Sequence, residues 1–83
     1  MNPFGLTIAT VDKTVFKGQA VHVKIVAGDG SRGIEARHEP LFVLLKPGSD
    51  VQVTLVDGKR ETYRLANGFF TCRDNLCRIV CLM

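Results

Sequence analysis

The residues best suited to chemistry in this 83-residue chain lie between positions 28 and 48. Glycines at positions 28, 30 and 33 surround Asp29 and Arg32, and His38 lies a few residues later. Closely spaced glycines can turn backbone N–H groups toward a phosphate, and histidine exchanges protons near neutral pH. The segment therefore raises two hypotheses: a phosphate-binding loop and a catalytic or metal-binding histidine.

The residues after the glycines weaken the phosphate hypothesis. A phosphate-binding loop opens onto a helix, and its Walker form ends in Gly-Lys and then Ser or Thr. Here residues 34–37 read Ile-Glu-Ala-Arg and give no amphipathic helix. We therefore expect a loop that links two strands, and we expect no bound cofactor.

His38 lacks the partners that catalysis or metal binding requires. The other histidine, His22, falls on the polar face of a predicted strand, and neither Cys-x-x-Cys nor His-x-x-x-His spacing occurs. No carboxylate pair or serine stands in a catalytic context. We predict a structural or interface histidine, no catalytic residue and no metal site, so the chain is not expected to be an enzyme.

The three cysteines are Cys72, Cys77 and Cys81. An odd number in extended chain argues against a disulfide framework and for a reducing compartment. If a turn at residues 73–75 closes a hairpin, Cys72 and Cys77 face each other across it. Even then we predict reduced thiols, because free cysteine packs as a small apolar residue.

The elements that must position these residues are short strands. Apolar residues alternate with polar ones, as in Val21, Val23 and Ile25, and no apolar stripe has helical spacing. We predict an all-β fold, a small sandwich of about eight to ten short strands in one domain over residues 1–83, with separate strands at residues 15–16 and 21–25. Turns are expected at Lys17-Gly18, Pro47-Gly48, Asp57-Gly58 (a two-residue hairpin turn), Asn67-Gly68 and residues 73–75.

Charge and hydropathy exclude several classes of partner. Eleven Lys and Arg against eight Asp and Glu give a net charge of +3, and both signs are dispersed along the chain. A nucleic-acid interface needs basic residues clustered on one face, usually with stacking aromatics, so no nucleic-acid partner is expected. The N-terminus has no secretory pattern, and the longest apolar run, residues 41–45, is too short to cross a bilayer. Any membrane association must go through a partner.

The order of the motifs resembles the β-sandwich domain of the epsilon subunit of F-type rotary ATP synthases. That family has an alternating strand and then Phe-x-Gly, here Phe16-Lys17-Gly18, and a glycine loop ending in Gly-Ile, here Gly33-Ile34. It continues with His-x-Pro-Leu at residues 38–41 and Lys-Pro-Gly at residues 46–48. The resemblance covers essentially the whole chain.

The resemblance implies a rotor subunit with no chemistry of its own. It would couple the gamma subunit to the c-ring in proton- or sodium-driven ATP synthesis, at the cytoplasmic face of a bacterial plasma membrane or an equivalent energy-transducing membrane. It would meet the membrane only through the complex. By the same analogy the c-ring contact falls on Gly28, Asp29, Gly30, Ser31 and Arg32, and the gamma-subunit contact on Thr10, His38, Leu41 and Val43.

Three departures from the family pattern accompany this resemblance. Ala36-Arg37 replaces the usual Pro-Gly before the histidine, and Ser31 with Arg32 replaces a loop that is often acidic. The family usually continues into a two-helix C-terminal domain that restrains ATP hydrolysis, whereas this chain stops at Met83. We therefore expect the helical hairpin to be absent, either in a naturally short form or in a chain cut at the domain boundary.

Two other classes of protein stay open. One is a stand-alone sandwich or barrel that binds a small ligand or nucleic acid through its basic surface. The other is a metal-dependent enzyme that uses His38 with Cys72 or Cys77. Salt-sensitive binding of single-stranded nucleic acid would favour the first, and stoichiometric zinc the second.

Overall fold

The computed structural model describes residues 2–83 and contains eight β-strands in that range. The predicted all-β fold is confirmed, and the number of strands lies at the lower end of the expected eight to ten. No helix occurs in residues 2–83, so none there could span a membrane. The strands are β1 (Phe4–Ala9), β2 (Thr14–Ala27), β3 (Gly30–Ile34), β4 (Leu41–Leu45), β5 (Asp50–Leu55), β6 (Arg60–Arg64), β7 (Asn67–Arg73) and β8 (Leu76–Leu82).

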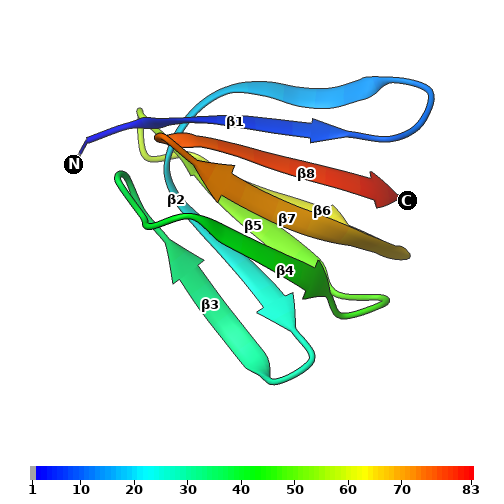
Figure 1. The fold of residues 1–83 in the computed structure, drawn as a ribbon. Helices are drawn as coiled ribbons and strands as arrows, with labels where there is room; N and C mark the ends of the chain where they lie inside the picture. Colours follow the sequence, from blue (N-terminus) through cyan, green and yellow to red (C-terminus); the bar gives the residue numbers. More distant parts are fainter. Residues whose placement is uncertain (1) are drawn as a thin grey trace.

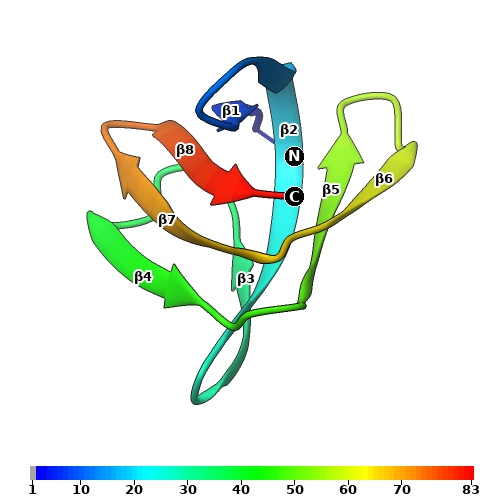
Figure 2. The same ribbon diagram turned by 90° about the vertical axis from the view of Figure 1, so that its right-hand side faces the viewer.

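Two layers of strands face each other, and the long strand β2 belongs to both (Figure 1). The first sheet runs from the N-terminal half of β2 through β1, β8 and β7 to β4, with β1 and β8 parallel. The second sheet runs from β3 through the C-terminal half of β2 to β5 and β6. Figure 2 shows β4, β7 and β8 on one side of β2 and β5 and β6 on the other.

Strand β2 changes layers at a bulge around Val21. Ala20 pairs with Leu55 and His22 with Thr54, so β2 has one residue more than β5 at this point. Ala20 and Val21 are consequently both buried. A bulge bends and twists its strand, which lets β2 leave β1 and join β5 without a break. The prediction of separate strands at residues 15–16 and 21–25 is therefore wrong, because the backbone between them keeps pairing with β1.

The core lies between the two layers and is built from the inward residues of every strand except β6. Among the described residues, every fully buried side chain is apolar or a cysteine. The predicted inward set on β2, Val21, Val23 and Ile25, is confirmed. Alternation of this kind is typical of sheets that cover a core on one face.

Two of the predicted turns close hairpins in the structure. At Asp57-Gly58 the loop is longer than predicted. The predicted two-residue turn needs a positive φ at both residues, and only Gly58 has one, 91°. The Gly58 N–H donates to Leu55 O over 2.9 Å and the Leu55 N–H to Lys59 O over 2.8 Å, which closes a three-residue loop. The turn at residues 73–75 is confirmed as a two-residue turn, with positive φ at Asp74 and Asn75.

Asn67 and Gly68 do not form the predicted turn; they begin β7, and the chain bends at Ala66. A Cβ atom on Gly68 would lie 2.6 Å from the carbonyl oxygen of Val80 and 2.8 Å from Cβ of Cys81. The close approach of β8, rather than a turn conformation, therefore requires glycine here.

Tyr63 is the one tyrosine of the chain, and it lies on β6 at the edge of the core. Its hydroxyl donates to Glu61 Oε1 over 2.6 Å, and its ring centroid lies 6.4 Å from that of Phe16. Burial, and next the hydrogen bond to Glu61, raise the pKa of the Tyr63 phenol from 10.0 to about 12.

We expect Gly68→Ala to lower the free energy of unfolding by about 1–3 kcal/mol, as overpacking does in other cores. Gly28→Ala is the matched control, because a Cβ atom there meets nothing within 4 Å and Gly28 has no left-handed φ. Urea unfolding midpoints of the two variants test this. Equal midpoints would show that β8 can move away from the added methyl group without loss of stability.

We expect the absorbance of tyrosinate in the folded chain to titrate near pH 12 rather than 10. Because the folded pKa is raised, the contribution of Tyr63 to stability is intact below pH 10 and is lost as the pH rises toward 12. The chain has no tryptophan, so the ultraviolet titration reports this one side chain. Glu61→Gln should lower the midpoint part of the way, and an unchanged midpoint would exclude a role for Glu61.

Candidate functional site

The glycine-rich segment is a hairpin rather than the predicted loop. Gly28 and Asp29 form its turn, and residues 30–34 are strand β3, paired with β2 from Ala27↔Gly30 to Val23↔Ile34. Figure 1 shows this hairpin projecting at the bottom of the molecule. Because the backbone of β3 pairs with β2 and leads into no helix, it forms no phosphate-binding helix N-terminus.

The tip of this hairpin carries an ion pair of its own. Arg32 Nη2 lies 3.2 Å from Asp29 Oδ2, and the two side chains are 39% and 72% exposed. Gly28, Gly30 and Ser31 are also exposed. The structure therefore gathers all five predicted c-ring contact residues at one projecting tip, which we call the hairpin tip, and it offsets the positive charge of Arg32 within that tip.

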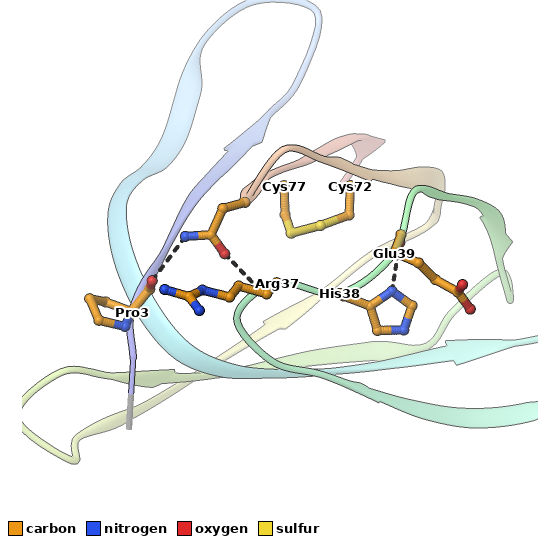
Figure 3. Close-up of a disulfide and its surroundings, with 7 residues drawn as sticks. Pro3, Arg37, His38, Glu39, Cys72 and Cys77 are labelled. Carbon is orange, nitrogen blue, oxygen red and sulfur yellow. Dashed lines mark hydrogen bonds between the residues drawn. A yellow bond between two sulfur atoms is a disulfide. The ribbon is translucent and has the colours of Figure 1, made fainter.

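The segment around His38 is held from two sides (Figure 3). Arg37 has a positive φ of 63°, and its N–H donates to Asn75 Oδ1 over 2.8 Å. Asn75 Nδ2 in turn donates to the carbonyl oxygen of Pro3 over 3.2 Å. His38 Nδ1 lies 2.8 Å from the carbonyl oxygen of Glu39, to which its N–H donates. This geometry fixes the backbone of the loop and gives His38 no side-chain partner in the described part of the chain.

The prediction of reduced thiols is wrong for two of the three cysteines. Cys72 and Cys77 face each other directly across β7 and β8, and the structure joins them in a disulfide with their Cα atoms 4.1 Å apart. The predicted facing is confirmed, but these two thiols are not free. Cys81 is the free cysteine of residues 2–83, and burial raises the pKa of its thiol. No group of three or more His, Cys, Asp or Glu in that range could hold a metal ion.

The four residues predicted to contact the gamma subunit do not form one cluster. Leu41 pairs with Cys72, so it and the preceding His38 lie toward one end of the first sheet. Thr10 comes directly after Ala9, which pairs with Val80, and so lies toward the other end. Val43 is 7% exposed and points into the core. Its side chain is therefore unavailable to a partner.

The outer face of the first sheet carries apolar side chains that were not among the predicted contact residues. Phe42 and Leu44 on β4 are 62% and 69% exposed, and the Phe42 ring stacks on Phe69 with centroids 5.3 Å apart. Leu44 pairs with Phe69, and Phe69 with Val80, so one apolar row crosses three strands. We call this the apolar patch: Phe42, Leu44, Phe69, Val80 and Leu82.

The apolar patch adjoins the hairpin tip. A hollow of about 540 Å³ is lined by Leu44 and Phe69 from the patch, by Gly28 from the tip, and by Lys46 and Pro47 between them. A signal for the patch was present in the sequence. Residues 41–45 are apolar without interruption, which on an antiparallel strand indicates that both faces become covered.

The outer face of the second sheet is polar in contrast. Lys24, Gln52 and Thr62 form one row across β2, β5 and β6. His22 is half-buried, with Nε2 2.8 Å from where a Cβ atom on Gly33 would lie. The two outer faces of the sandwich therefore differ in kind, and the apolar one is suited to a lasting protein contact.

Comparison with known proteins identifies the fold. A family model for the beta-sandwich domain of the ATP synthase delta/epsilon chain matches residues 3–82. The ATP synthase epsilon chain of Delftia acidovorans is 30% identical over 80 residues, which cover 96% of this chain and 57% of that one. This chain thus spans little more than half the length of that curated relative.

Solved structures agree with this match. A chain in the Euglena gracilis mitochondrial ATP synthase (OSCP, F1 and c-ring) aligns with TM-score 0.87 and 25% identity, covering 94% of this chain and 49% of that chain. A chain from the Tetrahymena thermophila mitochondrial ATP synthase central stalk and c-ring aligns with TM-score 0.77 and 15% identity, covering 95% and 63%. The resemblance inferred from the motifs is confirmed, and the chain belongs to the ATP synthase delta/epsilon beta-sandwich family.

Proposed function

We propose that this chain is the β-sandwich of a rotor subunit that couples the gamma subunit of an F-type ATP synthase to its c-ring during ion-driven ATP synthesis. The match of residues 3–82 to the delta/epsilon family carries this proposal. The subunit does no bond chemistry and belongs to the central stalk. It works at an energy-transducing membrane, such as the cytoplasmic face of a bacterial plasma membrane, and reaches that membrane through the complex.

A coupling subunit must transmit torque without deforming, and several features of the sandwich support this. Strand β2 belongs to both sheets, so the layers cannot slide without breaking its backbone pairing. The Cys72–Cys77 disulfide ties β7 to β8 beside the His38 loop. A close-packed apolar core transmits strain because it compresses little.

The apolar patch is the surface that we assign to the gamma subunit. Aromatic and large aliphatic side chains dominate the centres of stable interfaces. Phe42 and Leu44 replace Val43 in this role, since alternation along β4 turns them outward and Val43 inward. Leu41 shares the inward face of β4 with Val43 and packs against the core, so its side chain also lies outside this contact. His38 precedes β4 at one end of the first sheet and Thr10 follows β1 at the other, so a contact that includes both extends along that sheet.

The hairpin tip is the surface that we assign to the c-ring. It projects from the body of the sandwich (Figure 1), and its residues are small or polar, as a contact with polar loops requires. The hollow at Gly28, Pro47 and Phe69 joins the tip to the apolar patch. The hairpin tip can therefore contact the c-ring while the adjoining apolar patch contacts the gamma subunit.

We expect Phe42→Glu to weaken binding of the gamma subunit by about 30-fold or more, because a charge in the centre of an apolar interface must be desolvated. Val56→Glu is the matched control: Val56 is also 62% exposed but lies in the loop between β5 and β6. Binding of each purified 83-residue variant to the gamma subunit of the same organism, measured by calorimetry, tests this. Equal affinity of the two variants would contradict the assignment, and no binding by the unaltered chain would contradict the proposed function.

A charge swap at the hairpin tip separates its internal ion pair from a contact with the ring. Asp29→Arg with Arg32→Asp keeps the 3.2 Å pairing geometry available but reverses its direction. If Arg32 contacts acidic groups of the ring loops, the swap should weaken assembly with a gamma–c-ring complex, and more strongly at low salt. Arg60→Glu, on exposed β6, serves as the control. If the swapped variant assembles as well as the unaltered chain at every salt concentration, Arg32 makes no charge contact with the ring.

A further inference from the structure

A trough runs along the outer face of β1, beside the apolar patch. Its volume is about 490 Å³. The outward residues of β1 are small, since Gly5 and Thr7 alternate with the buried Phe4, Leu6 and Ile8. Longer side chains rise on either side, from Lys17 and Gln19 on β2 and from Leu76 and Arg78 on β8.

The rims of this trough are basic. Thr7 pairs with Lys17 on one side and with Arg78 on the other, so the two cations flank it in one row across three strands. Neighbouring strands lie about 4.8 Å apart, which places the two Cα atoms roughly 10 Å from each other. A chain segment lying over Thr7 is therefore within reach of both charged groups.

Neither cation is neutralised within the described chain. The ion pairs of residues 2–83 join Arg32 to Asp29, Lys59 to Asp57, Arg64 to Asp50 and Arg73 to Asp74, and they leave Lys17 and Arg78 out. Among those residues, no aspartate or glutamate lines the trough. Its charge is thus free to pair with carboxylates of another molecule.

The trough is continuous with the surface assigned to the gamma subunit. On β8, Arg78 in the trough shares its face with Val80 and Leu82 of the apolar patch. Arg78 also pairs with Thr71, which pairs with Phe42. A partner seated on Phe42 and Leu44 and extending across the sheet therefore covers the trough.

We propose that the gamma-subunit segment seated on the first sheet is acidic along one edge, with one carboxylate directed to Lys17 and another to Arg78. This inference rests on the proposed function and adds the charge of the gamma-subunit surface that contacts the first sheet. Charge complementarity at the edge of an apolar contact sets partner choice and register. A small anion is a weaker occupant, because no polar side chain within residues 2–83 is buried to orient one.

The test is Lys17→Glu combined with Arg78→Glu, measured against the gamma subunit at low and high salt. The glutamates would repel the partner's carboxylates, which should raise Kd about tenfold or more at low salt. Salt screens this repulsion, so the rise in Kd should be smaller at high salt. Lys24→Glu with Arg60→Glu is the matched control, because these exposed cations lie on the second sheet and make none of the ion pairs of the described chain. Thermal unfolding checks that both double variants fold.

The outcomes separate this inference from the function on which it rests. If Phe42→Glu abolishes binding while the double variant at Lys17 and Arg78 binds as tightly as the unaltered chain at low salt, the apolar contact stands and the acidic edge is refuted. A loss that salt does not change also refutes it. Failure of the unaltered chain to bind the gamma subunit overturns both proposals.

Discussion

Strand β2 is shared by two sheets, and most of the remaining architecture depends on that sharing. Its N-terminal half pairs with β1 and its C-terminal half with β3 and β5, and the bulge at Val21 makes the change of partners. Because Ala20 and Val21 are both buried, the alternation of inward and outward residues resumes in a new phase beyond the bulge. Both halves thus face one core, and a single backbone links the two layers covalently.

The same constraint gives the sandwich two outer faces of different character. The second sheet presents the polar row of Lys24, Gln52 and Thr62, whereas the first presents the apolar patch and the basic trough. An exposed apolar patch suits the first sheet to contact with another protein, and a polar surface suits the second sheet to water.

Much of the fold could be predicted from the sequence, and the failures have identifiable causes. Period-two alternation at Val21, Val23 and Ile25 correctly predicted a half-buried strand, and the turn at Asp74-Asn75 was predicted from its residue types. The turn predicted at Gly68 was wrong because glycine signals both turns and close packing, and only the approach of β8 decides between them. The glycines at positions 28–33 likewise predicted a loop, although most of that segment pairs with β2.

The sequence by itself determined the all-β class and the family, because alternation and motif order are properties of the chain. The tertiary structure decided which residues distant in the chain lie on one surface. Lys17 and Arg78 are far apart in the chain and flank Thr7 only because β1 pairs with β2 on one side and with β8 on the other. The pairing of β4 with β7 turned Val43 into the core and left Phe42 outside it. The facing of Cys72 and Cys77 was predicted from the turn at residues 73–75, and the structure added the disulfide between them. A local turn fixes the register of a tight hairpin such as β7–β8, whereas the pairing of strands far apart in the chain depends on contacts that no local pattern of residues encodes.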